Sequence, residues 1–245
     1  MKTPRIAIPE PTSNDPAYNE RSWRQYAAAV EGAGGQAIKI PLEASPAEVA
    51  RMASSCEGVL LPGSGADVNP EKYGQEPIPE CAAADPAREA VDELLMQDAA
   101  NLHKPLFGIC YGFQSWNVWR GGTLIQDLKT GVDHKPGREV REAHRVSLDP
   151  ESRIAEITGQ TELTVNSSHH QALDHPGDGL AVVAKSVQDS VAEAVEGTGE
   201  QFVIAVQWHP ERTFDSSPAS RALFTAFVEA AAEWQPREIR ESVAE

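Results

Sequence analysis

The chain has 245 residues and a formal net charge of −16, from 21 Lys and Arg against 37 Asp and Glu. Its composition, 40% hydrophobic and 24% charged, is that of a globular protein and excludes collagen-like, mucin-like and largely disordered chains. The acidic balance argues against nucleic acid or an anionic membrane as main partner, because both require a basic surface. Three cysteines without CxxC spacing, and no apolar run of signal-peptide or membrane-helix length, predict a cytoplasmic protein.

Strands and helices are predicted to alternate through the first half of the chain. The expected order is strand 5–8, helix 20–33, strand 36–40, a helix opened by Ser45-Pro46, strand 58–61, helix 85–103, strand 106–109 and helix 112–119. Short connections between such elements indicate an α/β fold, here a three-layer sandwich in which helices cover both faces of a mostly parallel central sheet.

The second half is predicted to extend this sheet. Residues 140–148 and 162–165 are expected to be antiparallel or edge strands, and 180–184 and 191–195 a hairpin. A strong strand at 202–207 and a helix at 218–234 follow, before a charged tail that we expect to fray from Gln235. Without repeats or linkers, residues 1–245 are predicted to form one domain with its core at about 5–234.

One cysteine stands in a pattern that carries chemistry. Cys110 lies between Gly108 and Gly112, after an apolar strand and before a helix. Such a G-x-C-x-G pattern is typical of a nucleophile elbow, whose sharp turn leaves no room for flanking side chains. The helix N-terminus would then favour the thiolate through its partial positive charge. A buried structural cysteine is the plainer interpretation of the pentapeptide alone.

A base and its orienting group are predicted at the end of another strand, in the sequence Gln207-Trp-His-Pro-Glu211. His209 and Glu211 would point the same way if residues 209–211 are extended, and the carboxylate could then hold the imidazole. Both motifs stand at the carboxyl ends of predicted strands, where open α/β sheets place their sites. We therefore predict a catalytic triad of Cys110, His209 and Glu211, against the alternative of a hydrogen-bonded histidine at a strand end.

Two polar loops are further candidates for the site. In Leu60-Leu-Pro-Gly-Ser-Gly65, the backbone N–H groups of Gly63 and Ser64 are predicted to form an oxyanion hole with that of Tyr111, although Pro-Gly-Ser-Gly is also a common turn. The adjacent His169 and His170 permit a metal interpretation, which the absence of a second ligand cluster at suitable spacing disfavours. A loop that faces the substrate, or a hydrogen-bond network, is the preferred interpretation.

Together these motifs resemble the class I glutamine amidotransferase superfamily, and within it the gamma-glutamyl hydrolases of the peptidase C26 type, including the gamma-glutamyl-gamma-aminobutyrate hydrolases. The resemblance covers about residues 5–230 and is carried by residues 61–74, 108–128, 166–171 and 207–211. It implies a flavodoxin-like α/β core with the Cys110–His209–Glu211 triad. The resemblance to the gamma-glutamyl-gamma-aminobutyrate hydrolases also implies a role in polyamine catabolism.

The resemblance also implies the reaction. Cys110 would attack the side-chain amide of a gamma-glutamyl group, His209 would protonate the leaving amine, and water would release glutamate from the thioester. The remaining matching positions would hold the gamma-glutamyl substrate; they are Gln114, Ser168, His169, His170 and Gln171. No metal or organic cofactor is implied. Tyr111 stands where this branch commonly has arginine, which bears on the substrate rather than on the chemistry.

Two other functions are compatible with the sequence. One is a glutaminase subunit that supplies ammonia to a separate synthetase, and the other is an inactive binding protein. The presence of every expected catalytic residue type disfavours the second. A homodimer is expected on general prevalence alone.

Overall fold

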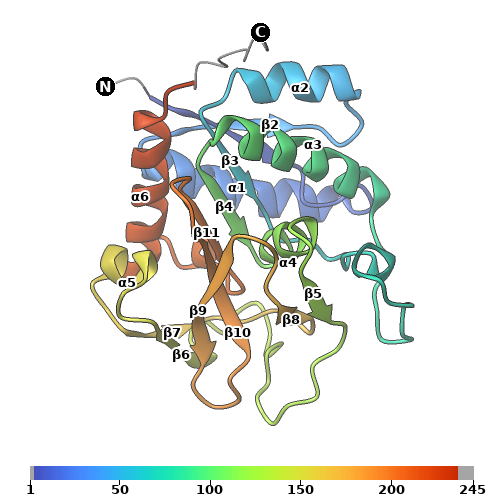
Figure 1. Ribbon diagram of the computed structural model, residues 1–245, viewed down its shortest axis with the longest axis vertical. Helices are drawn as coiled ribbons and strands as arrows, with labels where there is room; N and C mark the ends of the chain where they lie inside the picture. Colours follow the sequence, from blue (N-terminus) through green and yellow to red (C-terminus); the bar gives the residue numbers. More distant parts are fainter. Residues whose placement is uncertain (1–2, 237–245) are drawn as a thin grey trace, which may run out of the picture.

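The computed structural model describes residues 3–236, so most of the predicted frayed tail, 237–245, lies outside the described residues. Within this range the strands form one 11-stranded sheet (Figure 1). Its parallel part has the order β2-β1-β3-β4-β11, comprising β2 (Gln36–Ile40), β1 (Arg5–Pro9), β3 (Gly58–Leu61), β4 (Leu106–Ile109) and β11 (Val203–Val206). The last three are buried along their whole length, as expected for strands covered on both faces.

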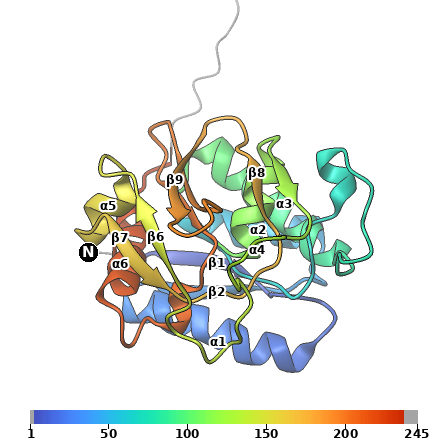
Figure 2. The ribbon, with the colours of Figure 1, turned by 90° about the horizontal axis from the view of Figure 1, so that it is seen from below.

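Helices cover the two faces of the parallel strands. One face packs against α1 (Pro16–Gly32) and α6 (Pro218–Glu233), and the other against α2 (Pro46–Ser54), α3 (Pro86–Leu102) and α4 (Tyr111–Trp119). Figure 2 shows α1 on one side of β1 and β2, with α2 and α4 on the other. Each face has its own apolar core, one around Phe107 and Phe224 and one around Leu95 and Trp116. The predicted three-layer α/β fold is confirmed.

The helix starts follow the capping chemistry of the sequence. Ser45 accepts a hydrogen bond from the Glu48 backbone N–H while the Glu48 side chain returns to the Ser45 backbone N–H, so the start predicted for α2 is confirmed. Asp85 caps the N-terminus of α3, so the helix start predicted at residue 85 is confirmed. The prediction for α1 is wrong by one turn, because Asp15 and Pro16 already begin the helix.

An antiparallel extension continues the sheet beyond β11. It has the order β10 (Ala192–Gly197), β9 (Leu180–Ser186), β6 (His144–Leu148) and β7 (Glu162–Val165), and the short strands β8 (Ala172–His175) and β5 (Thr123–Ile125) branch from β10. The predicted hairpin and edge strands are confirmed. Residues 140–143 were wrongly predicted as strand, since β6 begins only at His144. The short β5, β8 and α5 (Arg153–Thr158) were not predicted.

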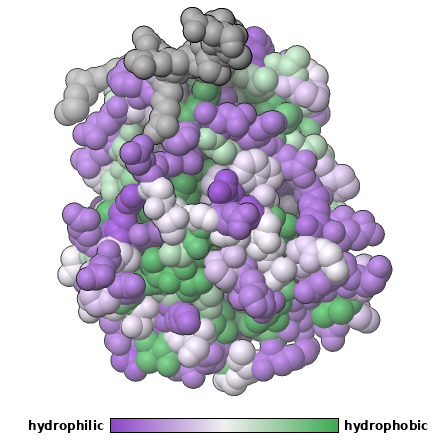
Figure 3. Space-filling model, viewed as in Figure 1, coloured by the Kyte–Doolittle hydropathy of each residue, from purple (hydrophilic) through white to green (hydrophobic). Residues whose placement is uncertain are grey.

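The surface is predominantly polar. Hydrophilic side chains cover most of the face shown in Figure 3, with smaller hydrophobic areas between them. Large hydrophobic residues with substantial exposure are scattered through the sequence: Ile78, Ile125, Val140 and Val187. Among the described residues, every helix is too short or too polar to cross a membrane.

Candidate active site

Cys110 stands at the turn between β4 and α4. Its backbone has φ 53° and ψ −103°, a conformation that residues other than glycine rarely adopt. The Cys110 N–H donates to the carbonyl oxygen of Val206 at 2.8 Å, which ties the turn to the neighbouring strand β11. Such local strain, held in place by surrounding structure, is typical of a nucleophile elbow.

The two glycines around Cys110 are required by packing. A Cβ on Gly112 would lie 2.1 Å from the carbonyl oxygen of Leu61, and one on Gly108 would lie 2.8 Å from that of Gly112. Both contacts are with backbone atoms, which have little freedom to move away. The crowded turn predicted from the G-x-C-x-G spacing is therefore confirmed.

His209 and Glu211 form a hydrogen-bonded pair at the end of β11. The His209 Nδ1 atom lies 2.8 Å from Glu211 Oε1, and both side chains are almost fully buried. The path of the chain differs from the prediction, because Pro210–Arg212 form a 3₁₀ turn, η2, rather than an extended segment. This turn brings the two side chains together by folding the backbone back. The predicted pairing is present, but the predicted backbone geometry was wrong.

Asn166 fixes the backbone of His209 from the side of β7. The Asn166 Nδ2 donates to the carbonyl oxygen of His209 at 2.8 Å, and the His209 N–H donates to Asn166 Oδ1 at 2.8 Å. This reciprocal pair is buried and joins the antiparallel extension to the end of β11. Asn166 is thus a positioning residue, a role that its place in the polar loop did not by itself reveal.

Arg212 contacts the other nitrogen of the imidazole. Its Nη2 lies 3.2 Å from His209 Nε2. A guanidinium can only donate, so Nε2 accepts and the proton of the neutral ring resides on Nδ1, facing Glu211. Burial lowers the pKa of His209 from 6.5 to about 4, and the charge of Arg212 adds to this effect while Glu211 opposes it. His209 is therefore an unprotonated base at neutral pH.

The thiol of Cys110 is neutral as well. Burial raises its pKa from 9.0 to about 12, and this outweighs the lowering by Arg212 and by the hydrogen bond from the backbone N–H of Tyr111. The prediction that the helix N-terminus favours the thiolate is therefore wrong for the unliganded protein. The resting pair is a thiol and a neutral imidazole, so proton transfer must accompany attack.

The predicted oxyanion donors are in different situations. The Gly63 N–H donates to the phenolic oxygen of Tyr26 at 3.0 Å, so this hydrogen bond already occupies it. A Cβ at Gly63 would lie 3.0 Å from His209 Cε1 and 3.5 Å from Cys110 Cβ, so this residue borders both the nucleophile and the base. The Tyr111 N–H faces the thiol, and Ser64 lines the adjoining cavity. Ser64 and Tyr111 thus keep the predicted placement, whereas the N–H of Gly63 is engaged elsewhere.

A cavity of about 210 Å³ opens beside Cys110 and His209. All five predicted substrate-binding residues line it: Gln114, Ser168, His169, His170 and Gln171. Lys135, Arg138 and Arg212 also line it together with one carboxylate, Asp67, so positive side chains outnumber negative ones in this cavity of a strongly acidic protein. Such side chains suit a substrate that carries carboxylates.

The polar lining is organised by hydrogen bonds among the predicted residues. The Gln114 Nε2 donates to Gln171 O at 3.2 Å and to Gln207 Oε1 at 3.0 Å. His170 lies between two carboxylates, with Nε2 3.1 Å from Asp67 and Nδ1 3.1 Å from Asp127. The hydrogen bond with Asp67 is the main cause that raises the pKa of His170. His169, in contrast, is buried and directs Nε2 towards the interior, 3.8 Å from Glu193.

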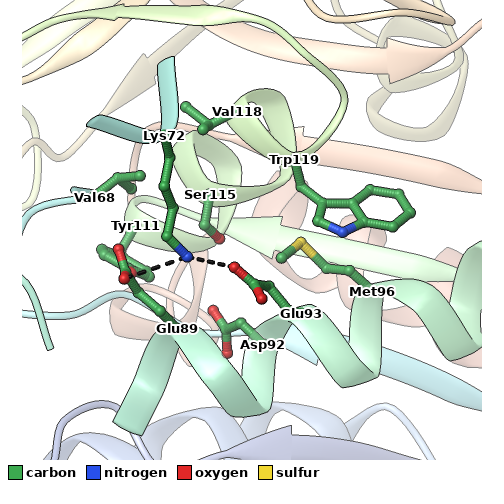
Figure 4. A pocket seen from close by; sticks show the side chains of 10 residues that line it. All are labelled: Val68, Lys72, Glu89, Asp92, Glu93, Met96, Tyr111, Ser115, Val118 and Trp119. Carbon is green, nitrogen blue, oxygen red and sulfur yellow. Dashed lines mark hydrogen bonds and ion pairs between the residues drawn. The ribbon is translucent and has the colours of Figure 1, made fainter. Parts of the chain in front are cut away.

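A second cavity, of about 220 Å³, lies behind Tyr111 between α3 and α4 (Figure 4). Lys72 reaches across it and forms ion pairs with Glu89 and Glu93 on α3. More of its lining is apolar than in the cavity beside Cys110, through Val68, Met96, Val118 and Trp119. Neither Cys110 nor His209 lines this second cavity. The chemistry therefore belongs to the cavity beside Cys110.

Comparison with known proteins agrees with this assignment. Residues 7–211 match the model of the peptidase C26 family. The chain belongs to this family. It is 37% identical over 217 residues to a provisionally named glutamine amidotransferase of Mycobacterium tuberculosis, covering 87% of this chain and 68% of that protein. It is 30% identical over 220 residues to gamma-glutamyl-gamma-aminobutyrate hydrolase PuuD of Escherichia coli, covering 84% of each.

A solved structure extends the likeness to the fold. A Thermoplasma acidophilum protein, provisionally described as a GMP synthase subunit, has a TM-score of 0.63 and 14% identity, and the match covers 95% of this chain and 96% of that one. At this identity the match supports the fold alone. The peptidase C26 chain is thus a hydrolase-family protein with a glutamine amidotransferase-like fold, as the motifs predicted.

The sequence did not reveal three groups that the site contains. Arg212 directly follows the Trp-His-Pro-Glu motif, and this proximity to His209 was the one available signal. Lys135 and Arg138 lie in a segment without regular structure, where no spacing marks a functional side chain. Their position depends on how the segment between β5 and β6 returns over the cavity.

Proposed function

We propose that this peptidase C26 protein is a cysteine hydrolase that cleaves the gamma-glutamyl amide bond of small gamma-glutamyl amines. The observation that carries the proposal is that Cys110 and the His209–Glu211 pair meet at the ends of β4 and β11, beside one cavity. A nucleophile, a base and an orienting carboxylate are the components that acyl transfer through a covalent intermediate requires.

Because Cys110 and His209 are both neutral at rest, the first step of the proposed reaction includes a proton transfer between them. The Cys110 sulfur attacks the amide carbonyl while its proton passes to His209 Nε2, and Glu211 stabilises the imidazolium that forms. For Nε2 to receive this proton, Arg212 must release its hydrogen bond to that atom. A carboxylate on the substrate offers the guanidinium a stronger partner than a neutral imidazole, so substrate binding would free the base.

The second half of the reaction returns the proton. The imidazolium protonates the nitrogen of the leaving amine, the C–N bond breaks, and a thioester remains on Cys110. Water then attacks the thioester with His209 again as base, which releases glutamate and restores the thiol. The backbone N–H of Tyr111, which faces the sulfur, is the donor placed to stabilise the oxyanion in both steps.

The cationic lining supports a particular class of leaving group. An amine that bears a carboxylate, such as gamma-aminobutyrate, gives the substrate two carboxylates in all. Lys135, Arg138 and Arg212 can pair with both, whereas glutamine has one carboxylate and a neutral leaving group. These side chains supply positive charge that the common arginine at position 111 would otherwise provide.

The alternative is a glutaminase that serves a separate synthetase, and the relatives named as glutamine amidotransferases favour it. The two functions differ in what the isolated chain can do. A hydrolase acts alone on gamma-glutamyl amines, whereas a glutaminase subunit requires a partner for full activity.

The test is glutamate release by the purified chain. The panel compares gamma-glutamyl-gamma-aminobutyrate, the uncharged gamma-glutamyl ethylamide, a gamma-glutamyl dipeptide and glutamine, with Cys110→Ala as control. We expect kcat/KM for gamma-glutamyl-gamma-aminobutyrate to exceed that for the ethylamide by about tenfold, as one charge-assisted contact provides. Hydrolysis of glutamine alone would contradict the proposal.

A further inference from the structure

Three histidines and one glutamate meet in the interior of the protein, next to the loop 166–171. His134 comes from the segment before β6, His144 begins β6, His169 belongs to the loop and Glu193 lies in β10. All four are at most 4% exposed. Buried ionisable groups are rare unless each has a partner, so this gathering requires a physical explanation.

The nitrogen atoms converge on one carboxylate oxygen. Glu193 Oε1 lies 2.9 Å from His144 Nε2, 3.5 Å from His134 Nδ1 and 3.8 Å from His169 Nε2. One donor atom from each of His134, His144 and Glu193 lies within 4.8 Å of the others. Tetrahedral Zn²⁺ with bonds of about 2.0–2.1 Å places its ligand atoms roughly 3.3 Å apart, and the distances from Glu193 Oε1 to His144 Nε2 and His134 Nδ1 lie on either side of this value.

Two of the imidazole rings are held by hydrogen bonds from the ring nitrogen that does not face Glu193. His134 Nε2 lies 2.9 Å from Asp189 Oδ2, and His169 Nδ1 lies 2.8 Å from the carbonyl oxygen of Gln171. These contacts put a proton on the outer nitrogen and leave the lone pair of the inner nitrogen directed at the cluster. A carboxylate or carbonyl behind each ligating histidine is the usual arrangement at zinc sites.

Several atoms facing the cluster have no hydrogen-bond partner. They include His134 Nδ1, His169 Nε2 and Glu193 Oε2, each with almost no solvent contact. An unpaired buried polar atom destabilises a fold, and here the unpaired atoms are electron-pair donors of the kind that bind a cation. A divalent cation at the centre would satisfy them together.

The geometry points to a structural Zn²⁺ site formed by His134, His144 and Glu193, which His169 Nε2 approaches from the loop, 3.8 Å from Glu193 Oε1. Two imidazoles and a carboxylate suit zinc, and His169 or a water molecule can complete a tetrahedron. All of these side chains are buried, so the ion would be structural rather than catalytic. For His144 to bind the ion through Nε2, the proton that Nε2 shares with Glu193 must move to Nδ1, so that the neutral ring presents the Nε2 lone pair to the ion. The site would join the segment before β6, the substrate-facing loop and β10.

The adjacent histidines of the loop therefore serve different sites. His169 faces inward to the proposed metal, whereas His170 faces Asp67 and Asp127 beside the cavity. Sequence spacing disfavoured a metal because the remaining ligands lie far from His169 along the chain. The fold supplies the second ligand cluster that the sequence lacked, and this inference does not depend on the proposed reaction.

The experiment measures metal in the untagged full chain, since a polyhistidine tag would itself bind zinc. Protein from zinc-supplemented cells is desalted and analysed by mass spectrometry for metals, and we expect about one Zn²⁺ per chain. His144→Asn and Glu193→Gln should each lose at least about tenfold in affinity, as ligand loss does. The matched control is His175→Asn, because His175 is an exposed histidine paired with Asp174 outside the cluster.

A second measurement does not depend on the variants folding. Chelator-treated wild-type chain is titrated with ZnCl₂, and then with CoCl₂, while thermal unfolding and visible absorption are recorded. A higher Tm with Zn²⁺ and the visible bands of tetrahedral Co²⁺ support the site. Less than about 0.1 Zn²⁺ per chain after incubation with excess ZnCl₂ and desalting would overturn it, and so would folded variants that retain as much Zn²⁺ as the wild type.

Discussion

The parallel strands and the antiparallel extension reach the active-site cavity in different ways. β4 ends directly before Cys110, β11 ends three residues before His209, and β3 ends at the loop with Gly63 and Ser64. The extension contributes loops instead, namely 166–171 and the segment with Lys135 and Arg138. In the proposed reaction, the buried strands therefore place the reacting groups, whereas the extension contributes the side chains proposed to contact the leaving group.

Replacing the nucleophile is expected to have the largest effect. Cys110→Ala should lower kcat for gamma-glutamyl amide hydrolysis by at least about 10⁴-fold, because no other group can form the thioester. Circular dichroism should show an unchanged fold. The matched control is Cys56→Ala, since Cys56 is also buried but packs against α2, away from the cavity. Full activity of Cys110→Ala would refute the triad.

Removal of the orienting carboxylate is expected to be less damaging. Glu211→Ala should lower kcat by about 10²–10⁴-fold and leave measurable turnover, since the ring loses the group that fixes its tautomer while the nucleophile remains. Steady-state kinetics at pH 7 measure this. A loss as complete as in Cys110→Ala would mean that Glu211 does more than orient His209.

A substitution on the loop side tests the other half of the comparison. Arg138→Gln should raise KM for gamma-glutamyl-gamma-aminobutyrate by about tenfold, through loss of a charge-assisted contact, and change kcat little. Arg141→Gln is the control, because Arg141 lies in the same segment but pairs with Asp215 at the surface. An effect confined to kcat would contradict the division between the two halves.

The pH dependence of kcat/KM reports on the base. Because burial lowers the pKa of His209 to about 4, the base is unprotonated above that pH, and activity should fall only as pH drops through about 4. In Arg212→Gln the loss of a neighbouring positive charge should raise this pKa, so the acid limb should move to higher pH. An acid limb near 6.5 in the wild type would show that His209 is not desolvated in this way.

The smallest effect is expected far from the site. Ser45→Ala removes the cap of α2 and should lower the free energy of unfolding by about 1 kcal/mol, with kcat/KM unchanged. Chemical denaturation measures the first quantity and the substrate assay the second. A change in activity would mean that α2 is coupled to the cavity, contrary to the local role of its cap.

Local signals allowed much of the parallel half, and the placement of Cys110, His209 and Glu211 beside one another, to be predicted. Apolar strands, caps and the glycines beside Cys110 each act within a few residues, so the sequence contains them directly. The pKa of Cys110 could not be predicted from such local signals. Burial by elements that are distant in the sequence raises this pKa, and that effect outweighs the influence of the helix N-terminus. The 3₁₀ turn at Pro210–Arg212 could not be predicted either, because its conformation depends on the elements that pack against it.

The antiparallel extension was harder to predict. Lys135 and Arg138 follow no periodic pattern. The pairing of β6 with β9 and of β9 with β10 brings His144 to Glu193, and a backbone hydrogen bond between the loops joins His169 to His134. Long-range strand pairing leaves little trace in short windows of sequence. The residues proposed to set specificity therefore required the three-dimensional structure.

The raised pKa of Cys110 has a consequence for the survival of the protein under oxidative conditions. Peroxides react with the thiolate, and with a pKa of about 12 roughly one sulfur in 10⁵ carries that charge at neutral pH. Burial also limits the access of oxidants to the sulfur. The idle enzyme is therefore expected to withstand peroxide that would inactivate enzymes with an exposed thiolate, and to become vulnerable chiefly during turnover.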